Sequence, residues 1–119
     1  MPRPRKRRRV CEMPMFKSFE PSERQSDPHV EIILSIDEYE VIRLIDLEGL
    51  NQEACAERME VARSTIQRMY EEAKRKVADS IVNGKRLKIE GGDYFLCDND
   101  PEECRPRCVR RRSHKRIQE

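Results

Sequence analysis

Hydrophobic residues recur with helical spacing in three segments of the chain, and polar residues mark the helix ends. The first segment, about 36–48, has a wide apolar face formed by Ile36, Tyr39, Val41, Ile42, Leu44 and Ile45. Ser35 and Glu38 have the spacing of a capping box at its start. Gly49 stands where a left-handed residue commonly ends a helix. The pattern therefore predicts a capped amphipathic helix before Gly49.

The next two segments predict a pair of helices separated by a tight turn. Asn51 can cap a helix over about 52–59, and a third helix runs from about Arg63 to about Ile81, before the stop signal Asn83-Gly84. Ala56 is small where the two helices would cross. The apolar positions expected to face inward are Cys55, Met59, Val61, Ile66 and Met69. This arrangement is typical of a helix-turn-helix.

Two further segments have the alternation of β-strands. Val30, Ile32 and Leu34 predict a short strand over 30–34. Residues 86–96 predict a β-hairpin that turns at Gly91-Gly92 and pairs Ile89 with Tyr94 and Leu87 with Leu96. A lone hairpin is marginally stable, so we expect it to pack on the helices or to pair with residues 30–34.

These elements predict a mainly α fold: a three-helix, helix-turn-helix domain with a short β-hairpin and irregular basic termini. We expect three regions: a basic arm with a Pro-containing irregular segment (1–29), the domain itself (30–97) and a Cys-containing basic tail (98–119). No apolar run approaches the roughly 18 residues of a membrane span. No secretory signal is recognisable, so we expect a cytoplasmic location.

Charge is distributed unevenly, although the net charge is only +2. Residues 1–10 hold six basic side chains and no acidic one, and residues 105–119 hold seven basic and one acidic. The other 94 residues carry 12 bases and 22 acids. Cationic ends suit a polyanion such as double-stranded DNA, although solvated tails would have the same composition.

The third helix carries polar side chains suited to base edges in its first turns. Arg can donate two hydrogen bonds to guanine, and Gln can pair its amide with adenine. Ser64 and Thr65 can instead contact phosphate, as can Asn51 and Gln52 at the start of the preceding helix. Arg3 and Arg5 in the basic arm are candidates for an adjacent minor groove. The predicted base-reading residues are Arg63, Ser64, Gln67 and Arg68.

The five cysteines fall into two sets. Cys55 occupies an inward position and is expected in the core. Cys97, Cys104 and Cys108 lie near one another in the sequence and could bind zinc together with Cys11. His29 or His114 could replace Cys11, and free thiols in a loose tail are the alternative. No constellation of catalytic residues stands out, so we do not expect an enzyme.

Several boxes resemble known families. Glu38-Tyr39-Glu40-Val41-Ile42-Arg43-Leu44, with the helix pair after it, is similar to region four of bacterial sigma factors. The chain also resembles an uncharacterised prokaryotic family of predicted DNA-binding proteins. That second resemblance rests on the start Met1-Pro2-Arg3-Pro4-Arg5-Lys6, the box from Asp37 to Leu50, Asn83-Gly84-Lys85 and Leu87-Lys88-Ile89-Glu90-Gly91-Gly92. Both resemblances imply a DNA-binding fold.

Three positions depart from the pattern of those families. Glu60 stands at the turn position usually held by Gly, and Ala62 stands where a Ser usually caps the recognition helix. Relatives often have Cys where this chain has Arg7, which removes one ligand from any metal site built on the arm.

The sequence thus predicts a sequence-specific DNA-binding protein, a transcriptional regulator that reads the major groove. Two alternatives stay open. One is a sigma-like interaction module that contacts RNA polymerase, and the other is a metal or redox sensor that uses the Cys cluster. A homodimer would suit a two-fold DNA site, but no heptad pattern shows where two subunits would meet.

Overall fold

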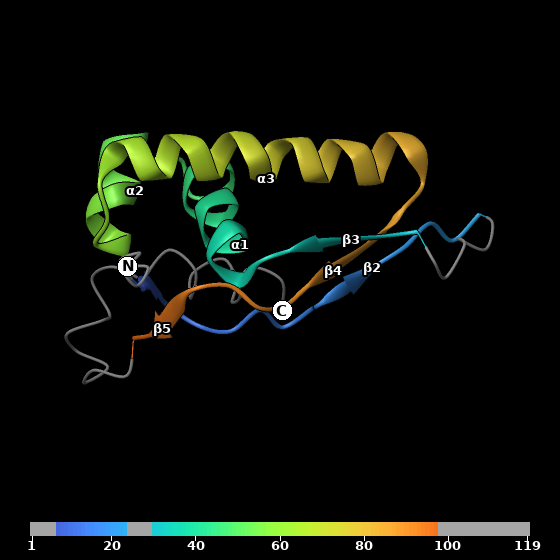
Figure 1. Ribbon diagram of the computed structural model, residues 1–119, viewed down its shortest axis with the longest axis horizontal. Helices are drawn as coiled ribbons and strands as arrows, with labels where there is room; N and C mark the ends of the chain where they lie inside the picture. Colours follow the sequence, from blue (N-terminus) through green and yellow to red (C-terminus); the bar gives the residue numbers. More distant parts are fainter. Residues whose placement is uncertain (1–6, 24–29, 98–119) are drawn as a thin grey trace, which may run out of the picture.

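The computed structural model describes residues 7–23 and 30–97 as a mainly α fold with small sheets. In Figure 1 the long helix α3 runs along one side, α1 lies beneath it, and the strands lie beyond α1. The elements, in chain order, are β1 (Arg8–Val10), β2 (Ser18–Phe19), β3 (Glu31–Leu34), α1 (Ile36–Ile42), η1 (Arg43–Leu47), α2 (Gln52–Met59), α3 (Arg63–Asn83), β4 (Arg86–Ile89) and β5 (Tyr94–Leu96).

The predicted caps of the first two helices are confirmed. The Ser35 hydroxyl accepts from the Glu38 amide at 3.2 Å, and the Glu38 carboxylate accepts from the Ser35 amide at 3.0 Å. Gly49 has φ 84°, the left-handed backbone expected after a helix. The Asn51 side chain accepts from the Ala54 amide at 2.8 Å and caps α2.

The first predicted helix ends in a π-helical turn, η1, which the sequence pattern did not indicate. The Glu48 amide donates to the Arg43 carbonyl at 2.9 Å, a bond that spans five residues. The same spacing brings the Arg43 guanidinium within 3.2 Å of the Glu48 carboxylate. The wider turn therefore accompanies a buried ion pair between these two side chains.

Three residues connect α2 to α3, and both unusual residues adopt the expected conformations. Glu60 is the sole non-glycine residue with positive φ in the described chain, at φ 61° and ψ 45°. Ala62 is the N-cap of α3, and no side chain caps the helix there. The turn therefore contains the two unfavourable features that the sequence implies: a residue with a Cβ in the left-handed region, and a helix start without a side-chain cap.

The strands form two sheets, and the predicted hairpin is wrong. Strand β4 lies between β2, which is antiparallel to it, and β3, which is parallel. The expected pairing of residues 30–34 with this segment is confirmed, with Ile32 opposite Leu87. Strand β5 instead pairs in parallel with β1, and Arg8 lies opposite Tyr94.

The hairpin fails because both edges of β4 are already occupied by other strands. Gly91 and Gly92 do have positive φ, at 75° and 107°, but they direct the chain past the start of α1. There the Gly91 carbonyl accepts from the Ile36 amide at 2.9 Å. Strand β5 therefore continues to β1, where Val10 is fully buried.

The core consists of two clusters, and α1 contributes to both. One lies between α1, η1, α2 and α3 and contains Val41, Leu44, Cys55, Ala56, Met59, Ile66 and Met69. The other lies toward the sheets and contains Val10, Leu34, Ile36, Ala73, Leu87 and Ile89. The inward positions predicted in α2 and α3 are confirmed, with Val61 half-buried. Within the described residues, no helix is long and apolar enough to cross a membrane.

Candidate functional site

The first turns of α3 have one buried face and one exposed face. Ile66 is fully buried and Met69 is 6% exposed, so this side of the helix belongs to the core. Thr65 is half-buried at the boundary. The predicted base-reading side chains all lie exposed on the other side, and we call this set the exposed face of α3: Arg63, Ser64, Gln67 and Arg68.

Helix α2 lies at the end of α3 that carries this face (Figure 1). Asn51 is exposed and Gln52 is half-buried at the start of α2. The Asn51 side-chain oxygen already accepts from the Ala54 amide. The other backbone amides in the first turn of a helix have no partner within the helix. The start of α2 can therefore offer backbone donors to an anion, with Asn51 holding the helix end in place.

Farther along α3, basic side chains are engaged within the protein. Lys74 lies over the Tyr70 ring, with its Nζ 4.3 Å from the ring centroid. Arg75 pairs with Glu72 on the same helix. Lys76 donates to the Glu38 carboxylate at 2.7 Å and is half-buried, so it is not placed for contact with a partner.

Tyr70 ties the same helix to η1. Its hydroxyl donates to the Asp46 carboxylate at 2.6 Å. That hydrogen bond raises the pKa of Tyr70, and desolvation and the negative charge of Asp46 act in the same direction. The contact holds α3 against η1 directly after the exposed face.

Two arginines of the predicted basic arm are buried, which corrects the expectation of a free arm up to residue 10. Arg8 and Arg9 are 7% and 5% exposed in β1. Arg9 donates to the Cys97 sulfur at 2.6 Å and to the Arg58 carbonyl at 3.5 Å, and its Nε lies 4.0 Å from the Glu60 carboxylate. Arg9 thus joins β1 to the turn between α2 and α3, a role without a local sequence signal. Arg3 and Arg5 lie outside the described residues.

A buried ionic network supports α1 from inside. Arg43 donates to both Glu40 carboxylate oxygens, at 3.0 and 2.8 Å, and to Glu48 at 3.2 Å. Burial alone would lower the pKa of Arg43, but the hydrogen bond to Glu40 and the charges of both glutamates raise it overall. Glu40 also accepts from the Cys11 amide at 3.2 Å. The network therefore connects the end of β1 to α1 and η1.

The cysteines occupy two environments. Cys55 is fully buried beside Met59, and desolvation raises the pKa of its thiol to about 12, as expected for a core residue. Cys11 and Cys97 directly follow Val10 and Leu96, which lie opposite each other in the β1–β5 sheet, and the Cys97 amide donates to the Val10 carbonyl at 2.9 Å. The pairing of β1 with β5 thus brings two of the four predicted zinc ligands to one sheet end.

The other predicted ligands cannot be placed. Cys104 and Cys108 lie outside the described residues, as do His29 and His114. Within residues 7–23 and 30–97, no three His, Cys, Asp or Glu side chains are grouped as metal ligands. The zinc site therefore stays a prediction.

Comparison with known proteins identifies the family. A family described as protein of unknown function DUF134 matches residues 1–97, which is most of the chain. The chain belongs to the DUF134 family. The match ends at Cys97, directly after β5, so it includes both sheets, the helices and the exposed face of α3. The predicted membership of an uncharacterised prokaryotic family is confirmed.

Relatives of this DUF134 protein are similar over most of their length. A UPF0251 protein of Desulfitobacterium hafniense is 50% identical over 112 residues, covering 94% of this chain and 90% of the relative. One of Caldicellulosiruptor saccharolyticus is 47% identical over 121 residues, covering 91% and 84%. One of Halothermothrix orenii is 49% identical over 96 residues, covering 81% and 71%. No solved structure matches.

Proposed function

We propose that α2 and α3 form a helix-turn-helix that binds double-stranded DNA in a sequence-specific manner, and that the protein regulates transcription. The observation that carries the proposal is the division of α3: Ile66 and Met69 are buried, whereas Gln67 and Arg68 between them are exposed. Such a helix can be held by its inner side while its first turns enter a major groove.

The surroundings of the exposed face agree with this proposal. Ser64 and Thr65 lie at the helix start, where a hydroxyl or a backbone amide can contact phosphate. Tyr70 and Asp46 fix α3 just beyond these turns, so the side chains are presented from a positioned helix. The proposal is of binding rather than catalysis, and no residue is assigned a catalytic role.

The decisive experiment has two stages. A target is first selected from random DNA with the full-length protein, and affinity for it is then measured for Gln67→Ala and Arg68→Ala. We expect each to lower specific affinity by about 1–3 kcal/mol and to relax the preference at one base pair. Arg75→Ala is the control, because it removes the same charge seven residues farther along α3. We expect this control to affect specific and non-specific DNA alike.

Equal losses of specific DNA affinity in Arg68→Ala and Arg75→Ala would contradict base reading by the exposed face of α3. DNA binding that appears only when RNA polymerase is added would instead support the sigma-like interaction module. A dimer would appear as a two-fold symmetric selected site.

The basic arm gives a second test of the same proposal. If Arg3 and Arg5 contact phosphates, replacing both with Ala should reduce the salt dependence of binding by roughly two counterions. Arg8 and Arg9 should be left intact, since both are buried in β1 and their removal would disturb the fold. If the dependence of DNA affinity on salt concentration is unchanged, Arg3 and Arg5 do not contact the DNA phosphates.

A metal or redox sensor is a second candidate function, favoured by the redox-active groups at one sheet end, where Cys11 is disulfide-bonded and Cys97 has a free thiol. Arg9 links Cys97 to the turn between α2 and α3, so a change at that sulfur could reach the proposed DNA-binding helix. Metal analysis of protein purified without chelator tests this candidate. Stoichiometric zinc, lost on Cys97→Ser, would support it, and metal-free protein with unaltered DNA affinity would reject it.

A further inference from the structure

Two cysteines in different oxidation states stand at one end of the β1–β5 sheet. Cys11 is bonded in a disulfide, whereas Cys97 has a free thiol. They directly follow Val10 and Leu96, which are register partners, and the Cys97 amide donates to the Val10 carbonyl at 2.9 Å. A disulfide and a free thiol at the ends of two paired strands are the two reactants of thiol–disulfide exchange.

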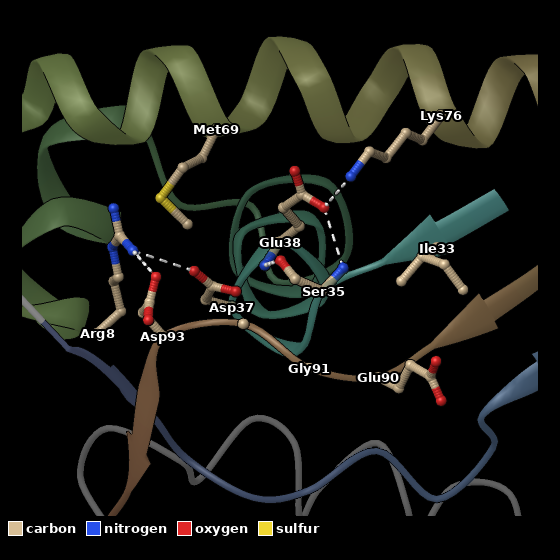
Figure 2. Close-up of a pocket in the computed structure, with 11 residues that line it drawn as sticks. Arg8, Ile33, Ser35, Asp37, Glu38, Met69, Lys76, Glu90, Gly91 and Asp93 are labelled. Carbon is tan, nitrogen blue, oxygen red and sulfur yellow. Dashed lines mark hydrogen bonds and ion pairs between the residues drawn. The ribbon is translucent and has the colours of Figure 1, made fainter. Parts of the chain in front are cut away.

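Arg8 ties the two strands together at their other end. Its amide donates to the Asp93 carbonyl at 3.0 Å, and its guanidinium lies 3.6 Å from the Asp93 carboxylate and 3.5 Å from that of Asp37 (Figure 2). Asp93 directly precedes β5, so β1 and β5 are held where both begin. Because each strand has only three residues, these contacts also determine which residues meet where the strands end.

The spacing of paired strands suits a direct bond between Cys11 and Cys97. Neighbouring strands lie about 4.8 Å apart, and a disulfide joins Cα atoms that are roughly 4.4–6.8 Å apart. The Arg9 guanidinium reaches from β1 to the Cys97 sulfur at 2.6 Å, so this sulfur is turned toward β1. A bond between the two sulfurs therefore needs no change in the register of the sheet.

Arg9 also supplies the positive charge that a reacting sulfur needs. The thiolate is the form that attacks a disulfide, and a neighbouring arginine stabilises its negative charge. Cys55 is the contrast within the same chain, because it is fully buried and desolvation raises the pKa of its thiol to about 12. Of the two free thiols among the described residues, Cys97 is thus the one placed to react.

We propose that Cys97 is the attacking thiol of an internal thiol–disulfide exchange with Cys11. The Cys97 thiol releases its proton to water, and its sulfur forms a bond to the Cys11 sulfur. The existing disulfide bond of Cys11 breaks, its electron pair leaves with the other sulfur, and that sulfur takes up a proton. One disulfide and one thiol are present before and after, so no oxidant or reductant is consumed. The inference deepens the redox candidate, on which it rests, and does not require DNA binding.

The exchange changes a contact of the turn between α2 and α3. Arg9 donates to the Cys97 sulfur and to the Arg58 carbonyl, and its Nε lies 4.0 Å from the Glu60 carboxylate. A sulfur in a disulfide has no negative charge, so the guanidinium then loses its charged partner at the end of β5 and keeps those in the turn. A bond between Cys11 and Cys97 therefore weakens the link between β5 and this turn.

The experiment maps the disulfides of the full chain after transfer from acidic to neutral pH, with oxygen excluded and no DNA present. Samples are returned to acid, which stops the exchange, and free thiols are alkylated. Cleavage before Asp98 separates Cys97 from Cys104, so mass spectrometry can identify the sulfur bonded to Cys11. We expect fragments joined through Cys11 and Cys97 to accumulate while the number of free thiols stays constant.

Cys97→Ser is the matched variant, because it removes the attacking sulfur. It should fold, since Cys97 is half-buried and belongs to neither core cluster, and it should keep the original disulfide at all times. Absence of fragments joined through Cys11 and Cys97 in the wild-type chain would overturn the proposal. Equal loss of the original disulfide in Cys97→Ser would also overturn it, because another nucleophile would then be responsible. Since DNA affinity is not measured here, failure of DNA binding is a separate result.

Discussion

At the scale of single residues, the turn between α2 and α3 contains a clear backbone penalty at Glu60. A left-handed backbone costs an L-residue with a Cβ about 1–2 kcal/mol, and glycine avoids this cost. We therefore expect Glu60→Gly to raise the free energy of unfolding by about 1 kcal/mol, measured by urea denaturation.

Glu60→Ala is the matched control, because it removes the carboxylate and its distant pairing with Arg9 but keeps the Cβ. We expect its stability to stay close to that of wild type. If Glu60→Ala stabilises as much as Glu60→Gly, the side-chain charge and not the backbone is the cause.

Tyr70 gives a residue-scale prediction for pH. Its folded pKa is raised, first by the hydrogen bond to Asp46, so the contact contributes fully below the unfolded pKa of about 10. The contribution is lost as pH rises through the higher folded pKa. We expect the stability difference between wild type and Tyr70→Phe to be constant at neutral pH and to shrink above about pH 10.

Urea unfolding of both proteins at a series of pH values, with absorbance titration of the tyrosines, measures this effect. Tyr94→Phe is the control, since that ring belongs to β5. A stability difference that does not change between neutral and strongly alkaline pH would show that the hydroxyl of Tyr70 does not act through ionisation.

At the scale of elements, the end of α1 and η1 depends on the buried network around Arg43. Removing one partner of a buried ion pair leaves an uncompensated charge and typically costs 3–5 kcal/mol. We expect Arg43→Met to destabilise by about that amount, because the buried Glu40 carboxylate would lose the guanidinium that donates to both of its oxygens. Thermal and urea unfolding give the measurement.

The exposed pair of Arg75 and Glu72 provides the comparison within the same protein. Exposed ion pairs contribute only about 0–1 kcal/mol, so Glu72→Gln should have little effect. A similar loss of unfolding free energy in Arg43→Met and Glu72→Gln would mean that the buried network around Arg43 stabilises the fold no more than an exposed ion pair does.

Elements governed by neighbouring residues could be predicted from the sequence, and those governed by distant partners could not. Ser35, Gly49 and Asn51 act within a few residues, so the helix ends follow from local chemistry. The Gly91-Gly92 dipeptide has the local signature of a hairpin, but β2 and β3 occupy the edges of β4.

The same distinction applies to the candidate site. The exposed face of α3 follows from helical periodicity, which places Gln67 and Arg68 opposite the core. The roles of Arg8 and Arg9 could not be predicted, because they arise from pairing of β1 with β5 at the other end of the described chain. Sequence composition assigns every arginine of residues 1–10 to the same basic arm and cannot separate the buried Arg8 and Arg9 from the exposed Arg7.

At the scale of the whole molecule, α1 links the two core clusters. Val41 of α1 packs in the cluster with α2, whereas Ile36, on the same helix, packs with the sheet residues Leu87 and Ile89. Because a single helix is shared, the helical part cannot open far without loss of contacts on the sheet side. We infer that the described part of the chain unfolds as one cooperative unit.

This inference predicts that a cavity in one cluster weakens protection in the other. Leu87→Ala should lower the free energy of unfolding by about 2–5 kcal/mol. Native-state hydrogen exchange should show the same loss of protection for the amides of α2, although no α2 residue belongs to the core cluster that contains Leu87. Val82→Ala is the control, because Val82 is 78% exposed on α3. Undiminished protection of α2 in Leu87→Ala would mean that the helices around Met59 form a separate unit, and that the proposed DNA-binding half is stable without the sheets.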